Sequence, residues 1–140
     1  MTNPRPYSAL IERLRAAGLR PTRQRLALSR LLHEGGNRHI SAEQLHEEAL
    51  ATGARVSLAT VYNALHQFTA AGLLREIVVE PGRSYFDTNV EDHHHFYFED
   101  SGRLEDIPGD RVRLVSLPKP PKGTRLSRVD IIIRVAEARG

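Results

Sequence analysis

The spacing of apolar residues changes near residue 73, and this change limits the folds open to the 140-residue chain more than any other feature. Up to residue 72, apolar side chains recur every three or four positions in four separate stretches, which is the spacing of helices that bury one face. Beyond it, "LLREIVVE" and "RSYFD" flank Pro81 and Gly82, a pair typical of a type II turn, and predict a β-hairpin. Helices followed by a hairpin are the element order of a winged helix.

Glycines and capping residues mark the ends of the four predicted helices. The third helix has the clearest start, because Ser41 can cap it and Gln44 stands at the last position of a capping box. Ile40 and Leu45 occupy the two positions of a hydrophobic staple. The four helices are predicted to begin near Ser8, Thr22, Ser41 and Ser57, with Thr22 and Ser41 as N-caps. They are predicted to end, in the same order, at Gly18, Gly35, Gly53 and Gly72.

The second half of the chain has the character of a small sheet. Residues 94–98, 103–107 and 129–136 read as short strands, and "LPKPPKG", with three prolines, predicts a loop before the last of them. Three short strands cannot bury a large core alone, so we expect a homodimer. The sequence therefore predicts an α+β chain, with a winged-helix DNA-binding domain over residues 1–83. Residues 84–140 would form a small C-terminal α/β, mainly β, domain for dimerisation and sensing.

Composition narrows the function classes. The net charge is +3, and residues 1–30 contain seven arginines and a single acid, Glu12. Such a segment would attract a polyanion such as DNA, although a solvated basic surface has the same composition. The absence of cysteine excludes a disulfide framework and a thiolate zinc site. No apolar run approaches the roughly 18 residues of a membrane span, and no signal-peptide core is present, so we expect a cytoplasmic protein without a membrane partner.

The fourth predicted helix carries an uncharged polar face. No Lys, Arg, Asp or Glu occurs between Ser57 and Gly72, whereas a merely solvated helix normally carries charges. Hydroxyl, amide and methyl groups can contact base edges in a groove of DNA; an amphipathic helix in a helical core is the alternative. The apolar positions predicted to face inward are Leu58, Val61, Leu65 and Phe68. The predicted groove-facing residues are Ser57, Ala59, Thr60, Tyr62 and Asn63, with Gln67 on the same side. The predicted phosphate contacts are Arg20, Thr22, Arg23, Arg25 and Arg83.

Three consecutive histidines stand out in "EDHHHFYFED". In a strand, His93 and His95 point to one side and His94 to the other. Zinc or iron(II) needs three to five nitrogen and oxygen donors when no thiolate is available. Candidate partners are His39, Asp87, Asp92 and Asp106. A polar strand edge or loop explains the same spacing equally well, so metal binding and a structural role both stay open.

Five motifs together resemble the ferric uptake regulator family of dimeric, metal-responsive transcription factors. They are "GLRPTRQR", "HISAEQL", "SLATVYNALHQFTAAGLL", "GRSYFD" and "DHHHFYFEDSGRLEDI". The resemblance implies a homodimer that binds double-stranded operator DNA and regulates iron-related genes, and no enzymatic activity. It also implies a divalent metal, iron, zinc or manganese, held where the two domains meet. By resemblance the ligands are His39, Asp87, His95 and Asp106, with His93 as a substitute.

The chain also departs from the family pattern. Phe98 and Ser101 stand where most members have a Cys-x-x-Cys structural zinc site, so that zinc cannot bind. Arg113 and Val129 fall where an acid and a histidine are expected, and Asn63 where members carry Arg. "SLPKPPKG" replaces the usual helix between the C-terminal strands. These features resemble the iron response regulator subgroup, which implies haem as a ligand; its N-terminal Cys-Pro motif is absent. The implied haem ligands are His93, His94 and His95.

Two alternatives come from other classes of function. A metal-dependent hydrolase built on the histidines lacks a glutamate at the spacing of a helical zinc motif and a nucleophile beside a base. A haem or metal carrier without DNA recognition does not account for the basic first half and the uncharged fourth helix.

Overall fold

A computed structural model describes residues 7–138 and divides the chain into two compact units, one ending at Val90 and the other beginning at Glu91. The sequence placed the domain border between residues 83 and 84 instead. The strand Arg83–Asp87 crosses this predicted border, pairs with two strands of the N-terminal unit and therefore stays with it. The outer ends of the two predicted domains, residues 1–6 and 139–140, lie outside the described residues.

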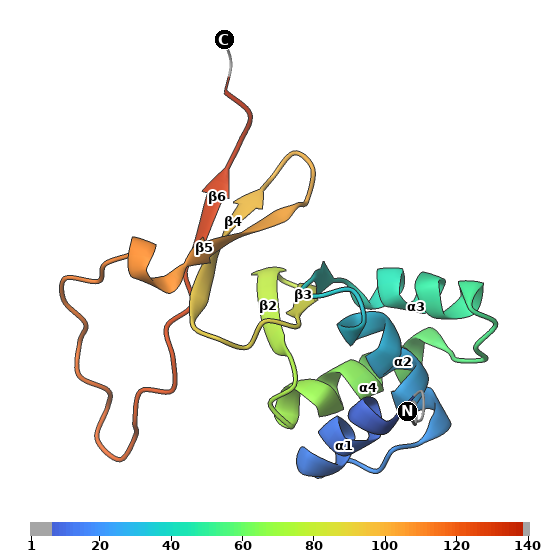
Figure 1. Cartoon of the computed structure of the whole chain (residues 1–140). Coiled ribbons are helices and arrows are strands. Elements are labelled where there is room, and N and C mark those ends of the chain that lie inside the picture. The colour runs from blue at the N-terminus through green and yellow to red at the C-terminus, as the bar shows by residue number, and fades with distance from the viewer. Residues whose placement is uncertain (1–6, 139–140) are drawn as a thin grey trace, which may run out of the picture. The chain divides into compact units, whose positions relative to one another are not determined.

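The N-terminal unit combines helices with a small antiparallel sheet of order β1-β3-β2 (Figure 1). Its elements are α1 (Ser8–Ala16), α2 (Arg23–His33), β1 (His39–Ile40), α3 (Ala42–Ala51), α4 (Leu58–Ala70), β2 (Arg75–Glu80) and β3 (Arg83–Asp87). The four predicted helices and the hairpin are confirmed. The two-residue strand β1 is an addition that the sequence analysis did not foresee.

Side-chain caps begin three of the helices, and those of Thr22 and Ser41 were predicted. The hydroxyl oxygen of Ser41 accepts the backbone N–H of Gln44 at 3.2 Å at the start of α3. The capping box is only half formed, because the Gln44 amide donates to Glu48 Oε2 at 3.3 Å. The staple residues Ile40 and Leu45 are both fully buried. Thr22 and Ser57 cap α2 and α4 in the same way as Ser41 caps α3.

The hairpin turns where the sequence indicated. Strands β2 and β3 pair up to Glu80 and Arg83, so Pro81 and Gly82 form a two-residue connection. Gly82 has a φ of 74°, which the third position of a type II turn requires and which side chains disfavour.

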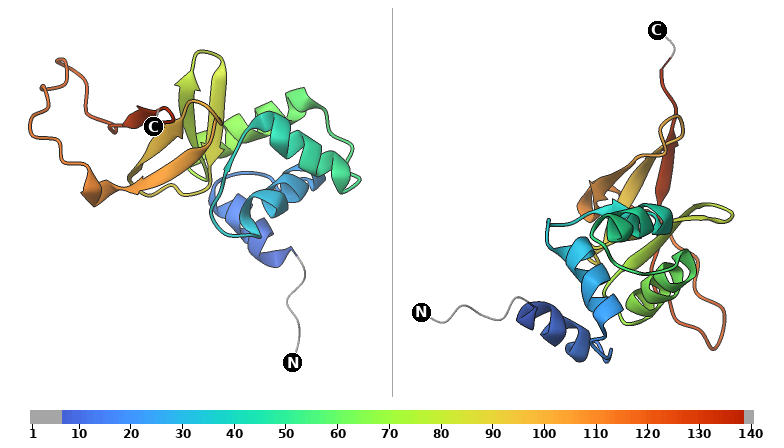
Figure 2. Two further views of the ribbon diagram at one scale, coloured as in Figure 1. Left: turned by 90° about the horizontal axis from the view of Figure 1, so that it is seen from above. Right: turned by 90° about the vertical axis from the view of Figure 1, so that its right-hand side faces the viewer.

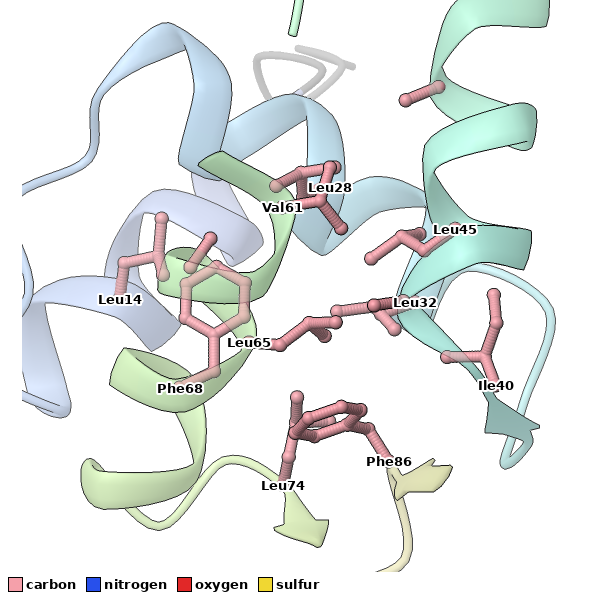
Figure 3. Close-up of a cluster of buried hydrophobic side chains, with 13 residues drawn as sticks. Leu14, Leu28, Leu32, Ile40, Leu45, Val61, Leu65, Phe68, Leu74 and Phe86 are labelled. Atoms are coloured by element: carbon pink, nitrogen blue, oxygen red, sulfur yellow. The ribbon is translucent and has the colours of Figure 1, made fainter. Parts of the chain in front are cut away.

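The core of the N-terminal unit is built from all four helices and the sheet (Figure 3). Val61, Leu65 and Phe68 of α4 are fully buried, which confirms the predicted inward face, while Leu58 at the first turn is only partly buried. Burying a large apolar side chain contributes about 1.5–3 kcal/mol, so this face fixes how α4 is rotated. The other labelled core residues are Leu14, Leu28, Leu32, Ile40, Leu45, Leu74 and Phe86.

The C-terminal unit is a three-stranded sheet of order β5-β4-β6. Its elements are β4 (His93–Phe98), β5 (Leu104–Pro108), the 3₁₀ helix η1 (Gly109–Arg111) and β6 (Ile132–Val135). The central strand β4 is antiparallel to β5 and parallel to β6. A long segment joins η1 to β6, as the prolines predicted (Figures 1 and 2). Among the described helices, none combines the length and apolar character that a membrane span needs.

Candidate nucleic-acid interface and metal centre

The polar face of α4 points to solvent. Ala59, Asn63 and Gln67 are exposed, and Thr60 and Tyr62 are partly exposed. The predicted orientation of the helix is therefore confirmed, and DNA reading by this face stays a prediction.

Two of the predicted groove residues also form the N-terminal cap of α4. Ser57 donates its hydroxyl to Thr60 Oγ1 at 2.9 Å and accepts the backbone N–H of Thr60 at 3.1 Å, so both hydroxyls take part in the helix cap.

Tyr62 is held in place by a carboxylate that the sequence did not indicate. Its hydroxyl donates to Glu43 Oε1 of α3 at 2.7 Å. This hydrogen bond lowers the pKa of the Glu43 carboxyl and raises the pKa of the Tyr62 phenol. One side of the Tyr62 ring packs on the hydrophobic core. A hollow of about 230 Å³ lies beside this pair and is lined in part by Arg83 and Tyr85 of the hairpin. The position of the Tyr62 ring is thus set from α3 as well as from α4.

Three of the four arginines predicted to bind phosphate are exposed, and the fourth, Arg25, is partly buried. Arg20 and Arg23 are exposed at the start of α2, and Arg83 is exposed at the hairpin turn. Arg25 instead joins two helices, since its guanidinium donates to the carbonyl of Arg20 and to Gln67 Oε1, both at 2.9 Å. Sequence reasoning missed Arg55, which is exposed just before α4. It lines a hollow of about 630 Å³ together with Arg23.

One pair of candidate metal ligands belongs to the N-terminal unit. The pairing of β1 with β3 places His39 directly opposite Asp87. His39 Nε2 lies 3.3 Å from Asp87 Oδ2. The second oxygen, Oδ1, accepts the backbone N–H of Asn89 at 2.9 Å, which orients the carboxylate. Two donors are therefore aligned, and two donors alone are fewer than zinc, iron or manganese requires.

Three further candidate ligands come together in the C-terminal unit. Asp106 on β5 is opposite His95 on β4. Asp106 Oδ1 lies 3.4 Å from His95 Nε2 and 3.5 Å from His93 Nε2. Their ligand atoms all lie within 4.8 Å of one another. Asp92, the other acid considered, is exposed and is outside this group.

The hydrogen bond of His93 indicates that the group of His93, His95 and Asp106 can bind a cation. Its Nδ1 lies 2.6 Å from the carbonyl oxygen of Glu91, and a carbonyl can only accept, so Nδ1 carries the proton. In the neutral ring, Nε2 then presents a lone pair toward the Asp106 carboxylate. Two acceptors facing each other require a cation between them, either a second ring proton or a metal ion. A histidine fixed through Nδ1 with Nε2 directed at the site is the usual arrangement of a metal ligand.

His94 lies on the opposite side of β4, as the strand alternation predicted. Its Nδ1 accepts the backbone N–H of Ile131 at 3.2 Å. The proton of the neutral ring is then on Nε2, and the ring is only half-buried. His94 therefore does not share the chemistry of His93 and His95.

The family model described as "Ferric uptake regulator family" matches residues 16–133, most of the chain. The chain belongs to the ferric uptake regulator family. Members of this family are metal-responsive transcriptional regulators that bind DNA as dimers, and they are not enzymes. The predicted function is therefore confirmed at this level, and the hydrolase alternative is not supported.

Similar proteins agree with this assignment. The chain is 36% identical over 102 residues to a ferric uptake regulation protein of Klebsiella pneumoniae, covering 72% of this chain and 66% of that protein. It is 36% identical over 100 residues to that of Escherichia coli K12, covering 71% and 68%. The ferric uptake regulator of Pseudomonas aeruginosa, solved with manganese, has a TM-score of 0.68 at 28% identity over 91% of this chain and 97% of that one.

A further solved structure supports the fold alone. The Vibrio cholerae ferric uptake regulator has a TM-score of 0.70 at 24% identity, over 91% of this chain and 98% of that one. The predicted α+β architecture, with a DNA-binding and a dimerisation domain, is confirmed by these likenesses.

Proposed function

We propose that this chain binds operator DNA as a homodimer in the cytoplasm, places the polar face of α4 in a groove, and controls iron-related genes. The observation that carries the proposal is the outward face of α4, which has no charged residue yet is not buried in the protein. A face of neutral hydroxyl, amide and methyl groups suits contact with base edges. Exposed arginines lie in the sequence segments on either side of it, where contacts to phosphates would position the helix.

Recovery of bound genomic DNA, with and without haem and iron(II), tests this proposal. We expect enrichment of a small set of palindromic, AT-rich sites near iron-related genes, and a change in enrichment when the effector is added. Recovery of DNA without any sequence preference would contradict the role of α4.

Substitutions of Tyr62 separate the ring from the hydroxyl. Tyr62→Ala removes both, and we expect it to relax the base preference at one position of each half-site. Tyr62→Phe keeps the ring and loses only the hydrogen bond to Glu43, so its preference should stay closer to that of the unmodified protein. Asn63→Ala should relax a different position. If Tyr62→Ala leaves both affinity and preference unchanged, the proposed docking of α4 is wrong.

We also propose that His39 and Asp87 share one divalent ion with His93, His95 and Asp106. The N-terminal pair alone offers too few donors for a stable site, the C-terminal group offers three, and together they supply five, within the four to six that zinc, manganese or iron(II) takes. Asp87 and His93 are only six positions apart, so the chain between them spans at most about 20 Å and permits both to reach one ion. The relative from Pseudomonas aeruginosa was solved with manganese.

A shared ion would connect the two units and bias their relative orientation. Since the C-terminal unit forms the dimer in this proposal, the spacing of two α4 helices would depend on the ion. Metal binding then changes operator affinity because the ion prefers one orientation over the others.

Metal titration of matched variants tests whether the ion is shared. We expect one zinc or manganese ion per chain by calorimetry, and a loss of affinity of about tenfold or more in both His39→Ala and His95→Ala. His66→Ala, which removes a histidine on the exposed side of α4, is the control and should bind like the unmodified protein. If only one of the two variants loses affinity, the ion belongs to one unit and the shared site is rejected.

We propose haem as a second ligand, held through His94, in line with the resemblance to iron response regulators. The support is that His94 faces away from the metal-ligand group and its ring is half-buried. To bind haem iron through Nε2, the ring proton has to move to Nδ1, and the hydrogen bond from the Ile131 N–H is then lost. A haem titration followed by the Soret band distinguishes the sites. We expect His94→Ala to lose the band and keep metal affinity, and His95→Ala to show the reverse; loss of both in either variant would contradict two separate sites.

A further inference from the structure

Opposite charges are separated along the sequence of the C-terminal unit. Residues 91–110, which include β4 and β5, hold seven carboxylates and one arginine. Residues 111–129, here called the basic loop, hold six Lys or Arg and no carboxylate. One of these cations, Arg128, is paired with Asp130 at 2.9 Å. The basic loop thus keeps a clear excess of positive charge, next to a strand pair with the opposite sign.

The basic loop extends away from the sheet of the C-terminal unit (Figure 2), and several of its exposed side chains are apolar. Every residue from 113 to 128 is exposed, and Val115 is 92% exposed. Leu117 and Leu126 are about half exposed. Prolines stiffen the loop, and a turn at its tip is closed by the backbone N–H of Thr124 donating to the carbonyl of Pro121. A stiff segment that presents both aliphatic and ammonium side chains is suited to a partner with an apolar and acidic surface.

The same unit contains a surface of that kind. A hollow of about 620 Å³ is formed by β4, β5, the end of β6 and the residues next to them. Its apolar lining is Phe96, Phe98, Val135 and Ala136, and its acidic groups are Asp100, Glu105 and Glu137. Asp100 Oδ2 accepts the backbone N–H of Glu137 at 2.8 Å, so the acidic side of the hollow is fixed. The hollow therefore complements the basic loop in both polarity and charge.

The basic loop joins the sheet at a different end from the hollow of the same chain. The loop leaves the sheet after Pro108, which is opposite His93 at the start of β4, and returns at Ile132, which is beside His95. The hollow lies at the other end of β4, where Phe98 is beside Val135. The points where the loop joins the sheet are roughly 10–15 Å from the far end of β4. No residue of the basic loop, which the structure describes throughout, lines the hollow of its own chain.

We propose that the basic loop of one chain fills the acidic hollow of a second copy, and that the second copy does the same in return. Lys119 and Lys122 would pair with Glu105 and Glu137, while Leu117 covers the aromatic lining. About ten residues on each side of the tip give the loop a reach of roughly 30 Å, enough to contact another chain. A two-fold dimer makes both contacts at once. This inference rests on the proposed homodimer and goes beyond it by naming what each copy contributes.

Charge exchange between two variants tests the contact. The loop variant carries Lys119→Glu and Lys122→Glu, and the rim variant carries Glu105→Lys and Glu137→Lys. In sedimentation equilibrium we expect the dimer dissociation constant of each variant alone to rise about tenfold or more. An equimolar mixture should return to within about threefold of the unmodified protein, because every loop then meets a hollow of opposite charge. All four positions are exposed, so the folding of the unit does not depend on them.

Two results would overturn the proposal: either variant dimerising as tightly as the unmodified protein, or a mixture as weak as the variants alone. The control variant carries Arg15→Glu and Arg55→Glu in the N-terminal unit. It has the same charge change as the loop variant and should dimerise like the unmodified protein. The readout needs no DNA. If the mixture recovers dimerisation but the unmodified protein does not bind operator DNA, the proposed function alone is refuted. If operator binding is normal but the mixture does not recover dimerisation, this contact alone is refuted.

Cross-linking is a second test, in which each variant replaces only one charged residue, either in the basic loop or at the hollow. Because the chain contains no cysteine, single Lys119→Cys and Glu105→Cys variants have no competing thiol. A short bismaleimide should link them across chains when the two proteins are mixed. Lys119→Cys mixed with Arg15→Cys is the matched control. Equal cross-linking in both mixtures would contradict the proposed contact.

Discussion

The exposed arginines near α4 determine how steeply operator binding should weaken with salt. Arg20, Arg23, Arg55 and Arg83 are exposed, whereas the guanidinium of Arg25 is engaged by Arg20 and Gln67. If each of the four contacts one phosphate in both halves of a dimer, the slope of log K against log salt is about −7, and affinity falls roughly 10⁴-fold between 50 and 200 mM. Arg23→Gln should reduce the slope to about −5 and the loss to roughly 10³-fold.

Fluorescence anisotropy with a labelled operator, at fixed pH and metal concentration, measures this slope. Arg23→Lys retains the charge and should keep a slope near −7, which separates electrostatics from shape. Arg134→Gln, in the C-terminal unit, is the control for a general charge effect. A slope for Arg23→Gln equal to that of the unmodified protein, or equal losses in Arg23→Gln and Arg23→Lys, would refute the assignment of Arg23 to a phosphate.

Three further predictions concern stability and the environment of α4. Burial, with a smaller effect of Arg13, lowers the pKa of His33 from 6.5 to about 4. Protonation therefore favours the unfolded chain, and stability that is complete above pH 6.5 falls as the pH approaches 4. The full shift corresponds to about 3 kcal/mol, which partial exposure should reduce to about 1–2 kcal/mol. The free energy of unfolding, measured in urea at pH 7 and pH 4.5, should fall less in His33→Gln than in the unmodified protein. Equal losses in the two proteins would contradict the prediction that His33 causes the loss. Phe68→Ala should lower the free energy of unfolding by about 3–5 kcal/mol, because the ring is fully buried; a cost under about 1 kcal/mol would mean that the core is packed differently. In Tyr62→Phe the pKa of Glu43, followed by carbon NMR, should rise toward 4.5, and an unchanged value would show that the hydroxyl is not its partner.

Local signals in the sequence were sufficient for most elements of the N-terminal unit. Ser41 is followed by a helix because its hydroxyl satisfies an N–H that no helical carbonyl can reach. Pro81 and Gly82 specify their turn through their own backbone preferences. The strand β1 could not be predicted in this way. It has two residues, too few for any periodicity, and it exists only because β3, almost fifty positions later, pairs with it.

The candidate ligands were identified by residue type and resemblance, but their grouping depends on strand register. His39 meets Asp87, and His95 meets Asp106, through pairing of residues far apart in the sequence. Side-chain partners were likewise beyond the reach of the sequence. Arg25 donates to Gln67, a contact that the sequence did not indicate, because the side of α2 that faces α4 is known only after the helices pack. Its predicted contact to a phosphate stays a prediction.

Operator affinity with and without manganese(II), measured for the unmodified protein and for His39→Ala, shows whether a shared ion controls DNA binding. If one ion joins the two units, adding metal should change the dissociation constant of the unmodified protein by at least about fivefold. His39→Ala should bind DNA in the absence of metal as the unmodified protein does, and should show no metal response. An equal response in both proteins, or none in the unmodified protein, would contradict the proposal that a shared ion controls DNA binding.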